Sequence, residues 1–197
     1  MDEERFQRAI ASIDERNRDD PHEIVVRGER RPKELAHSAL AAEWVERLVD
    51  GPSEALRLAA RAHHVRRWVI ARASYPSGRA GYHRWRRALQ ELHAEEAATI
   101  LAAHGYDEGT IERVGGLIKK RGLARKDDPE VQALEDALCL VFLETQLAAT
   151  ADKLDDREKT IDVLRRTAVK MSPTALALAQ GLPLTEDERA LLESALR

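Results

Sequence analysis

The chain has 197 residues, of which 43% are apolar and 34% charged, and its formal net charge is −3. This length suits one domain with a core of its own, and the single cysteine excludes a disulfide framework and a zinc module of paired cysteines. No apolar run approaches the roughly 20 residues of a membrane span, and the N-terminus MDEERFQRAI lacks the pattern of a signal peptide. We therefore expect a cytoplasmic protein of one domain.

Apolar side chains recur at helical spacing along nearly the whole chain, which predicts an all-α fold, a single-domain helical bundle. A short opening helix carries Phe6, Ile10 and Ile13. The following helices are expected at residues 32–49, 53–71, 83–103, 107–120, 129–150 and 155–170, and two short ones begin at Ser172-Pro173 and at the capping box of Thr185 and Glu188.

Two segments between these helices are expected to be irregular. Residues 17–31 are polar, and Ile24-Val25-Val26 is a weak strand candidate within them. Residues 73–82, ASYPSGRAGY, contain one proline and two glycines, which interrupt helices. Neither segment has the character of a domain boundary.

Residues 55–90 contain nine arginines and no Asp, Glu or Lys, so the rest of the chain is strongly acidic. The same segment holds four of the eight aromatic residues: Trp68, Tyr75, Tyr82 and Trp85. Arginine grips phosphate with a planar fork and stacks on rings, which lysine does not. This composition predicts an anion-binding surface. The alternative is that the arginines pair with acids elsewhere in the fold.

Four of the seven histidines lie on predicted helices: His37, His63, His64 and His93. One such residue alone is typical of a core, but several in a chain with few aromatics favour a metal site, because imidazole is the commonest ligand of first-row metals. A carboxylate for this site comes from Glu135 or Asp136 in the apolar stretch LEDALCLVFLE, where a buried acid needs a partner. Alternatively, one of these acids faces solvent while the other caps a helix or pairs with an arginine.

The order of these residues resembles the HD-domain metal-dependent phosphohydrolases over residues 33–145. The resemblance implies an all-helical core in which His37 is the first histidine, His63-His64 the dyad and Asp136 the last aspartate. His93 falls where many HD proteins carry a histidine for a second metal. Here His64 replaces the aspartate of the dyad, and imidazole does not bridge two metals as that carboxylate does. The resemblance therefore implies a mononuclear site of three histidines and Asp136, or a site that has lost its metal.

Several stretches are together similar to the family called domain of unknown function 4202, over nearly the whole chain. They are PKELAHSALAAEWVERL, ARAHHVRRW, SYPSGRAGYHRWR, LHAEEAATIL and DPEVQALEDALCLVFLE. This family brings no settled activity with it. Residues 151–197, beyond the HD-like core, are expected to form C-terminal helices that pack on it.

These signals combine into one hypothesis, a metal-dependent hydrolase of a nucleotide or another phosphate ester. A divalent ion (Mn²⁺, Fe²⁺, Ni²⁺ or Zn²⁺) would supply hydroxide from a bound water, with Asp136 and His64 as the catalytic residues among the ligands. The expected contacts to the substrate are phosphate binding by Arg66, Arg79 and Arg86, a hydrogen bond from Ser74, which otherwise caps a turn, and stacking on Tyr75, Tyr82 or Trp85.

Two other functions fit the same sequence. The arginine and aromatic residues of segment 57–87 are also typical of a non-catalytic protein that binds a nucleotide or RNA, with the histidines as core residues or ligands of a vestigial structural metal. A helical scaffold whose acidic remainder binds a protein partner is the third hypothesis. We expect a phosphorylated small molecule as the ligand and no membrane contact, and the sequence leaves a homo-oligomer open.

Overall fold

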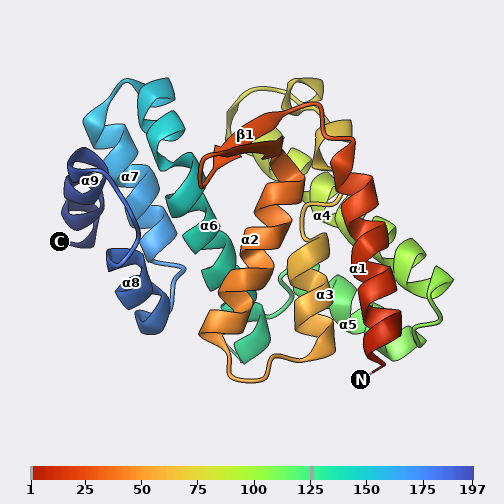
Figure 1. Cartoon of the computed structure of the whole chain (residues 1–197). Helices are drawn as coiled ribbons and strands as arrows, with labels where there is room; N and C mark the ends of the chain where they lie inside the picture. The colour runs from red at the N-terminus through yellow and green to blue at the C-terminus, as the bar shows by residue number, and fades with distance from the viewer. Residues whose placement is uncertain (1, 125–126) are drawn as a thin grey trace.

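The computed structural model describes residues 2–124 and 127–197. It confirms the all-α prediction, with one small β-hairpin among the described residues (Figure 1). The elements are α1 (Glu3–Arg18), β1 (Glu23–Val26), β2 (Glu29–Pro32), α2 (Lys33–Leu48), α3 (Glu54–Ala62), the 3₁₀ turns η1 (Arg67–Val69) and η2 (Arg72–Ser74), α4 (Gly78–Ala103), α5 (Glu108–Ile118), α6 (Pro129–Leu154), α7 (Arg157–Ala168), α8 (Pro173–Gln180) and α9 (Glu186–Leu196).

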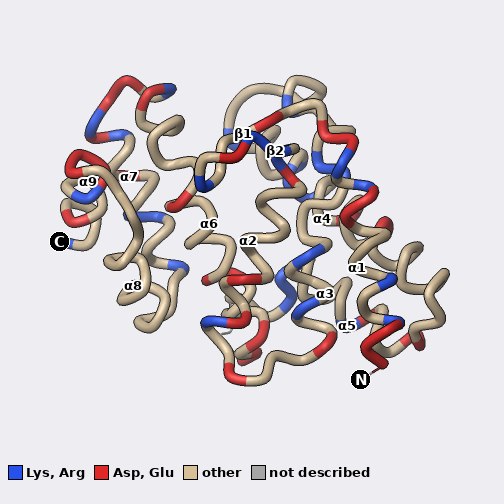
Figure 2. The backbone as a smooth tube through the Cα atoms, viewed as in Figure 1, with Lys and Arg blue, Asp and Glu red and all other residues tan. Residues whose placement is uncertain are grey.

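Helix α2 lies at the centre of the fold, between α6 and α3 (Figure 1). Its buried face carries Leu40, Ala41 and Trp44, as the sequence predicts. Helices α7 and α8 pack on α6, and α9 packs on α7, so the C-terminal helices lie on the far side of α6 from α2. Acidic residues gather at both ends of α1 and along the connection from α2 to α3 (Figure 2). No helix in the described part of the chain combines the length and the apolar character of a membrane span.

Most helix starts follow the local signals in the sequence. The Asp128 carboxylate accepts hydrogen bonds at the start of α6, which begins at Pro129, and the Ser172 hydroxyl accepts from Ala175 N–H at the start of α8. Thr185 and Glu188 form the expected capping box. These positions were predictable because cap and helix are adjacent in sequence.

Residues 17–31 are more regular than expected. Helix α1 continues to Arg18, and the weak strand candidate forms β1, which pairs with β2 in an antiparallel hairpin. The turn residues Arg27 and Gly28 have φ angles of 51° and 85°, the left-handed pair that suits a two-residue hairpin turn. The hairpin leads directly into α2, and Lys33 N–H donates to the His22 carbonyl where the two meet.

The predicted helix over 53–71 is wrong beyond Ala62. Helix α3 ends there, and residues 63–66 form turns before η1. Arg66 has a left-handed φ of 54°, and its backbone N–H donates to the Oδ1 of buried Asn17 at 3.0 Å. The helix is therefore stopped by a side chain of α1, which local spacing does not reveal.

The expected loop over 73–82 is shorter than predicted, because α4 begins at Gly78 rather than at His83. Gly78 has a φ of 83°, and Gly81 lies so close to the preceding loop that a Cβ there would meet the Pro76 carbonyl oxygen at 1.8 Å. Gly81 is thus required by the close packing of the loop on the first turn of α4, and it does not interrupt the helix.

Candidate functional site

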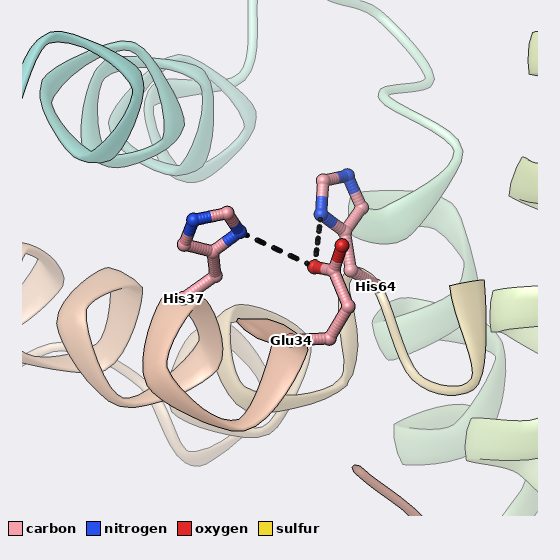
Figure 3. A group of neighbouring side chains, drawn as sticks. All are labelled: Glu34, His37 and His64. Atoms are coloured by element: carbon pink, nitrogen blue, oxygen red, sulfur yellow. Dashed lines mark hydrogen bonds and ion pairs between the residues drawn. The ribbon is translucent and has the colours of Figure 1, made fainter. Parts of the chain in front are cut away.

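The centre of the candidate site is Glu34, in the first turn of α2. Its backbone N–H donates to Asp20 Oδ2 at 2.9 Å, which caps α2 from the preceding segment because the N-cap Pro32 offers no side-chain acceptor. The Glu34 residue is only 4% exposed. Its Oε2 lies 3.0 Å from His64 Nδ1 and 3.4 Å from His37 Nδ1 (Figure 3). Each of the three residues thus offers one atom that could ligate a metal ion, and these atoms all lie within 4.8 Å of one another.

The hydrogen bonds around His37 determine which of its ring nitrogens carries a proton. Thr145 Oγ1 donates to the Val141 carbonyl at 2.7 Å, so its single proton is used. His37 Nε2, 3.2 Å from that oxygen, must then be the donor of the pair. A neutral His37 therefore presents the lone pair of Nδ1 to the Glu34 carboxylate. Two acceptors at 3.4 Å require a cation between them, either a proton or a metal ion.

His64 links Glu34 to the arginine segment. Its Nε2 accepts from Arg67 Nη1 at 3.5 Å, so Nδ1 carries the proton that is donated to Glu34. Arg67 Nε also lies 3.7 Å from Glu34 Oε1. Burial alone would raise the pKa of Glu34, but His64 and His37 together hold it well below its ordinary value. Glu34 is thus an anion surrounded by histidine and arginine nitrogens.

Arg67 also lines two cavities. The larger, of about 300 Å³, is here called the tryptophan cavity. Its lining includes Lys33, Glu34, Arg67, Trp68, Arg72 and Trp85. Trp85 is held by a 2.9 Å hydrogen bond from Nε1 to the Ile70 carbonyl, and Arg67 lies 4.9 Å from the centre of its ring. The cavity therefore places aromatic faces and cations directly beside Glu34.

The smaller cavity, of about 40 Å³, is here called the histidine cavity. Its polar lining consists of His63, His64, Arg67, Arg86, Gln90, His93 and Lys120. His63 Nδ1 donates to the Ala60 carbonyl at 2.7 Å, and His93 Nδ1 donates to the Val65 carbonyl at 2.9 Å. Burial lowers the pKa of His63 well below its ordinary value and that of His93 to about 3, so both rings are neutral near pH 7.

A model of the family described as Domain of unknown function (DUF4202) matches residues 7–192. The chain belongs to this family. Neither the curated proteins nor the solved structures contain a significant match to the chain.

In this DUF4202 protein His64 connects the predicted histidine ligands. It meets His37 at Glu34, and it also lines the histidine cavity, where its ring lies 4.2 Å from that of His63 and 5.5 Å from that of His93. Asp136 takes part in neither arrangement. Its Oδ1 accepts from Ser172 N–H at 2.8 Å and from Gln132 Nε2 at 2.9 Å, so it anchors the start of α8 to α6. Its surroundings do not support the predicted catalytic and metal-binding role.

Glu135 has a separate structural role in the DUF4202 fold. Its buried carboxylate pairs with Lys120 and, at 3.1 Å, with Lys170. Burial alone would raise its pKa, but the two lysines lower it to about 2. Both acids of the LEDALCL stretch are thus buried and satisfied within the core, and neither reaches the histidines.

The nine arginines of residues 55–90 divide into two sets. Four pair with carboxylates, namely Arg57 with Glu46, Arg61 with Asp14, Arg66 with Glu96 and Arg67 with Glu34. Five have no carboxylate partner among the residues that the structure describes: Arg72, Arg79, Arg84, Arg86 and Arg87. The segment therefore contains both kinds of arginine that its composition allows, those that pair with acids of the fold and those that remain for an anion-binding surface.

The predicted substrate contacts are likewise divided. Arg86 lines the histidine cavity, but Arg66 is occupied by Glu96, and Arg79 lies on the exposed face of α4 near His83. Ser74 is an exposed residue at the end of η2. For Tyr75, the backbone carbonyl accepts from Arg72 at 2.9 Å. Tyr82 is 41% exposed, with its ring 5.9 Å from that of Trp85.

Sequence reasoning did not identify Glu34, Asn17 or Thr145 in this DUF4202 chain. A signal for Glu34 was present, because it precedes His37 by three residues and so shares its helix face. Asn17 and Thr145 carried no such signal, since each reaches the site from a distant part of the chain.

Proposed function

We propose that this protein is a metal-dependent hydrolase of phosphate esters, with Glu34, His37 and His64 as the metal ligands. The observation that carries the proposal is the 3.4 Å approach of His37 Nδ1 to the Glu34 carboxylate, because in a neutral ring the Thr145 contact places the proton on Nε2 and leaves the Nδ1 lone pair facing the carboxylate. A metal ion is the cation that satisfies both groups and His64 together.

The donor set fits a first-row transition metal. Two imidazole nitrogens and one carboxylate oxygen suit Zn²⁺, Fe²⁺, Mn²⁺ or Ni²⁺, and a catalytic site keeps a further position open. Metal–ligand bonds of about 2.0–2.2 Å separate tetrahedral ligand atoms by about 3.4 Å, close to the 3.0 and 3.4 Å measured between Glu34 and the histidines. His37 also has the outer hydrogen bond, to Thr145, that orients a metal-binding imidazole.

When bound, such an ion supplies hydroxide near neutral pH and polarises a phosphoryl oxygen. The chain's own residues position the ester. Arg67 lines the tryptophan cavity beside Glu34, where its guanidinium offers donors to phosphate oxygens, and Lys33 and Arg72 add positive charge to the same lining. The faces of Trp68 and Trp85 accommodate the organic part of the substrate, which favours an aromatic group such as a nucleobase.

One rearrangement is required. With a metal on its Nδ1, His64 carries its proton on Nε2, which now accepts from Arg67 at 3.5 Å. Arg67 must therefore release His64, and this release frees its guanidinium for the phosphate. The resemblance to HD-domain phosphohydrolases supports the same proposal, with the difference that Glu34 supplies the carboxylate expected from Asp136.

A turnover assay tests the proposal. Chelator-treated protein is incubated with each metal in turn and with p-nitrophenyl phosphate and bis(p-nitrophenyl) phosphate. We expect metal-dependent release of nitrophenol that falls at least tenfold in Arg67→Gln, the order of loss for one charged donor. The matched control is Arg57→Gln, because Arg57 pairs with Glu46 away from the cluster. Equal turnover by both variants, or turnover without metal, contradicts the proposed site.

A second function is favoured by the five arginines for which the described part of the chain offers no carboxylate partner. They lie on η2 and the first half of α4, together with the exposed ring of Tyr82, and this combination suits single-stranded RNA or a nucleotide bound without catalysis. RNA bound in this way dissociates steeply as salt rises. Hydrolysis of the aryl phosphates by the protein distinguishes the first function from the second.

A further inference from the structure

The histidine cavity carries an inference of its own, which concerns the phosphate group of the substrate and so rests on the proposed function. Three cations line it: Arg67, Arg86 and Lys120. Lys120 pairs with Glu135 and Arg67 lies 3.7 Å from Glu34, whereas Arg86 has no carboxylate partner in the described part of the chain. The wall is therefore positive overall, which favours an anion and disfavours a bare metal ion.

The same cavity contains one group that an ordinary anion leaves unsatisfied. His93 is 2% exposed, and its buried Nε2 has no hydrogen-bond partner among the described residues. Its Nδ1 must carry the ring proton, because its partner is the Val65 carbonyl oxygen, which only accepts. Nε2 is then an acceptor, and a buried acceptor without a donor costs about 1–3 kcal/mol. A ligand that completes the cavity must bring both negative charge and a proton.

We propose that the histidine cavity binds a phosphate group that retains one proton, either as free hydrogen phosphate or as the monoanion of a phosphate monoester. Arg67, Arg86 and Lys120 donate to its unprotonated oxygens, and its hydroxyl donates to His93 Nε2. No covalent step is involved.

The size of the cavity agrees with this ligand. A space of this kind must reach roughly 10–15 Å³ before it holds one water, and a cavity of about 40 Å³ exceeds that minimum, so it has room for part of a phosphate group. Arg86 is exposed and Gln90 is half-buried, so the cavity opens along this side of α4, where the remaining oxygens or an ester group extend.

A comparison of phosphate with sulfate separates the two properties of the site, its positive charge and its need for a proton on the ligand. The two anions have the same shape, but near neutral pH sulfate has no proton to donate to His93. We expect calorimetric titration of the chelator-treated protein to show inorganic phosphate binding at least about tenfold more tightly than sulfate, since sulfate leaves the buried acceptor unsatisfied. Equal affinity for the two anions, or no phosphate binding at millimolar concentration, overturns the inference.

A matched pair of variants locates the site. Arg86→Gln removes the cation of the cavity that has no carboxylate partner, and we expect it to weaken phosphate binding at least about tenfold. Arg87→Gln is the control, because this neighbouring arginine is also exposed on α4 and lies outside the cavity lining. Losses of the same size in both variants show diffuse surface charge and contradict a built cavity.

Two further arms identify the source of the phosphate. At about pH 6, where a monoester keeps its proton on about half of the molecules, phenyl phosphate that competes with inorganic phosphate indicates a substrate site. Binding of inorganic phosphate alone indicates a site for the free ion, and both results agree with the proposed chemistry. Phosphate binding by metal-free protein also stands if the metal proposal fails. The last arm uses the His37→Gln variant, which lacks one of the proposed metal ligands. If this variant binds phosphate only after it has been loaded with Zn²⁺, the histidine cavity is a metal site and the inference is wrong.

Discussion

Asn17 of α1 holds the turn that carries the tandem histidines, because its Oδ1 accepts the backbone N–H of Arg66 at 3.0 Å across 49 positions of sequence. Arg66 has a left-handed φ of 54° and ends the turn of residues 63–66, which includes both histidines. The contact therefore supports the turn from which His64 approaches Glu34.

Asn17→Ala is expected to lower both stability and metal affinity. The substitution leaves the Arg66 N–H without its acceptor and removes a fully buried side chain, which costs about 1–3 kcal/mol of unfolding free energy. Urea unfolding and a competitive metal titration measure the two effects. Thr160→Val is the control, since it removes a buried hydroxyl from α7, which packs on α6 and α9. If both variants lose metal affinity equally, the effect is one of general stability and Asn17 does not position the site.

Gly81→Ala is expected to destabilise the protein by about 1–3 kcal/mol, because the new methyl would meet the Pro76 carbonyl oxygen and force the loop away from α4. Gly116→Ala tests the opposite case within α5, where the nearest atom to the added Cβ is Arg121 Cδ at 3.9 Å. It is expected to stabilise the helix by up to about 1 kcal/mol. Thermal unfolding of the two variants compares them directly, and equal shifts would refute the packing requirement at Gly81.

Glu135 is expected to make the protein sensitive to acid. Burial alone would raise its pKa, but Lys120 and Lys170 lower it to about 2, below its ordinary value of 4.5. A lowered pKa contributes stability that is present above about pH 4.5 and is lost as the pH falls toward 2. Glu135→Gln leaves two lysines without their anion and is expected to cost about 3 kcal/mol at neutral pH.

The measurement for Glu135 is the free energy of unfolding at a series of pH values between neutral and acid. We expect the wild type to lose stability more steeply than Glu135→Gln below about pH 4.5, since the variant lacks the titrating group. Glu15→Gln serves as the control, because the Glu15 side chain is 71% exposed in its pair with Arg18. Parallel pH curves for wild type and Glu135→Gln would contradict this assignment.

Asp136→Asn is expected to weaken the docking of α8 and leave the metal site intact. The Asp136 side chain accepts from Ser172 N–H and Gln132 Nε2, so the variant should lose about 1–2 kcal/mol of stability. Metal content and unfolding free energy are measured on the same preparation. A loss of metal with unchanged stability would restore Asp136 as a ligand and exclude our assignment of Glu34.

The parts of the fold that local chemistry decides were predictable from sequence. Asp128, Ser172 and Thr185 each cap a helix that starts immediately after them. The errors arose where a contact between elements decides the outcome. Asn17 accepts the Arg66 N–H at the turn that follows α3, and the Pro76 carbonyl packs so closely on α4 that only glycine fits at position 81.

For the candidate site, the sequence likewise predicted which side chains are buried but not which distant residues they contact. Helical spacing correctly placed His37 and His63 in the interior, and the burial of Asp136 was expected too. Its partner was not, because Ser172 lies 36 residues further along the chain. Glu34 has the appearance of an ordinary first-turn acid, which is favourable at any helix N-terminus, so its burial between two histidines became visible only in three dimensions.

Metal stoichiometry tests the central claim most directly. The protein is purified without chelator, loaded separately with Mn²⁺, Fe²⁺, Ni²⁺ and Zn²⁺, desalted and analysed by plasma mass spectrometry, alongside Glu34→Gln, His37→Gln and Asp136→Asn. We expect about one ion per chain in the wild type and in Asp136→Asn, and a loss of most of it in the other two variants. No bound metal in the wild type under any loading condition, or full retention in both Glu34→Gln and His37→Gln, would contradict the account.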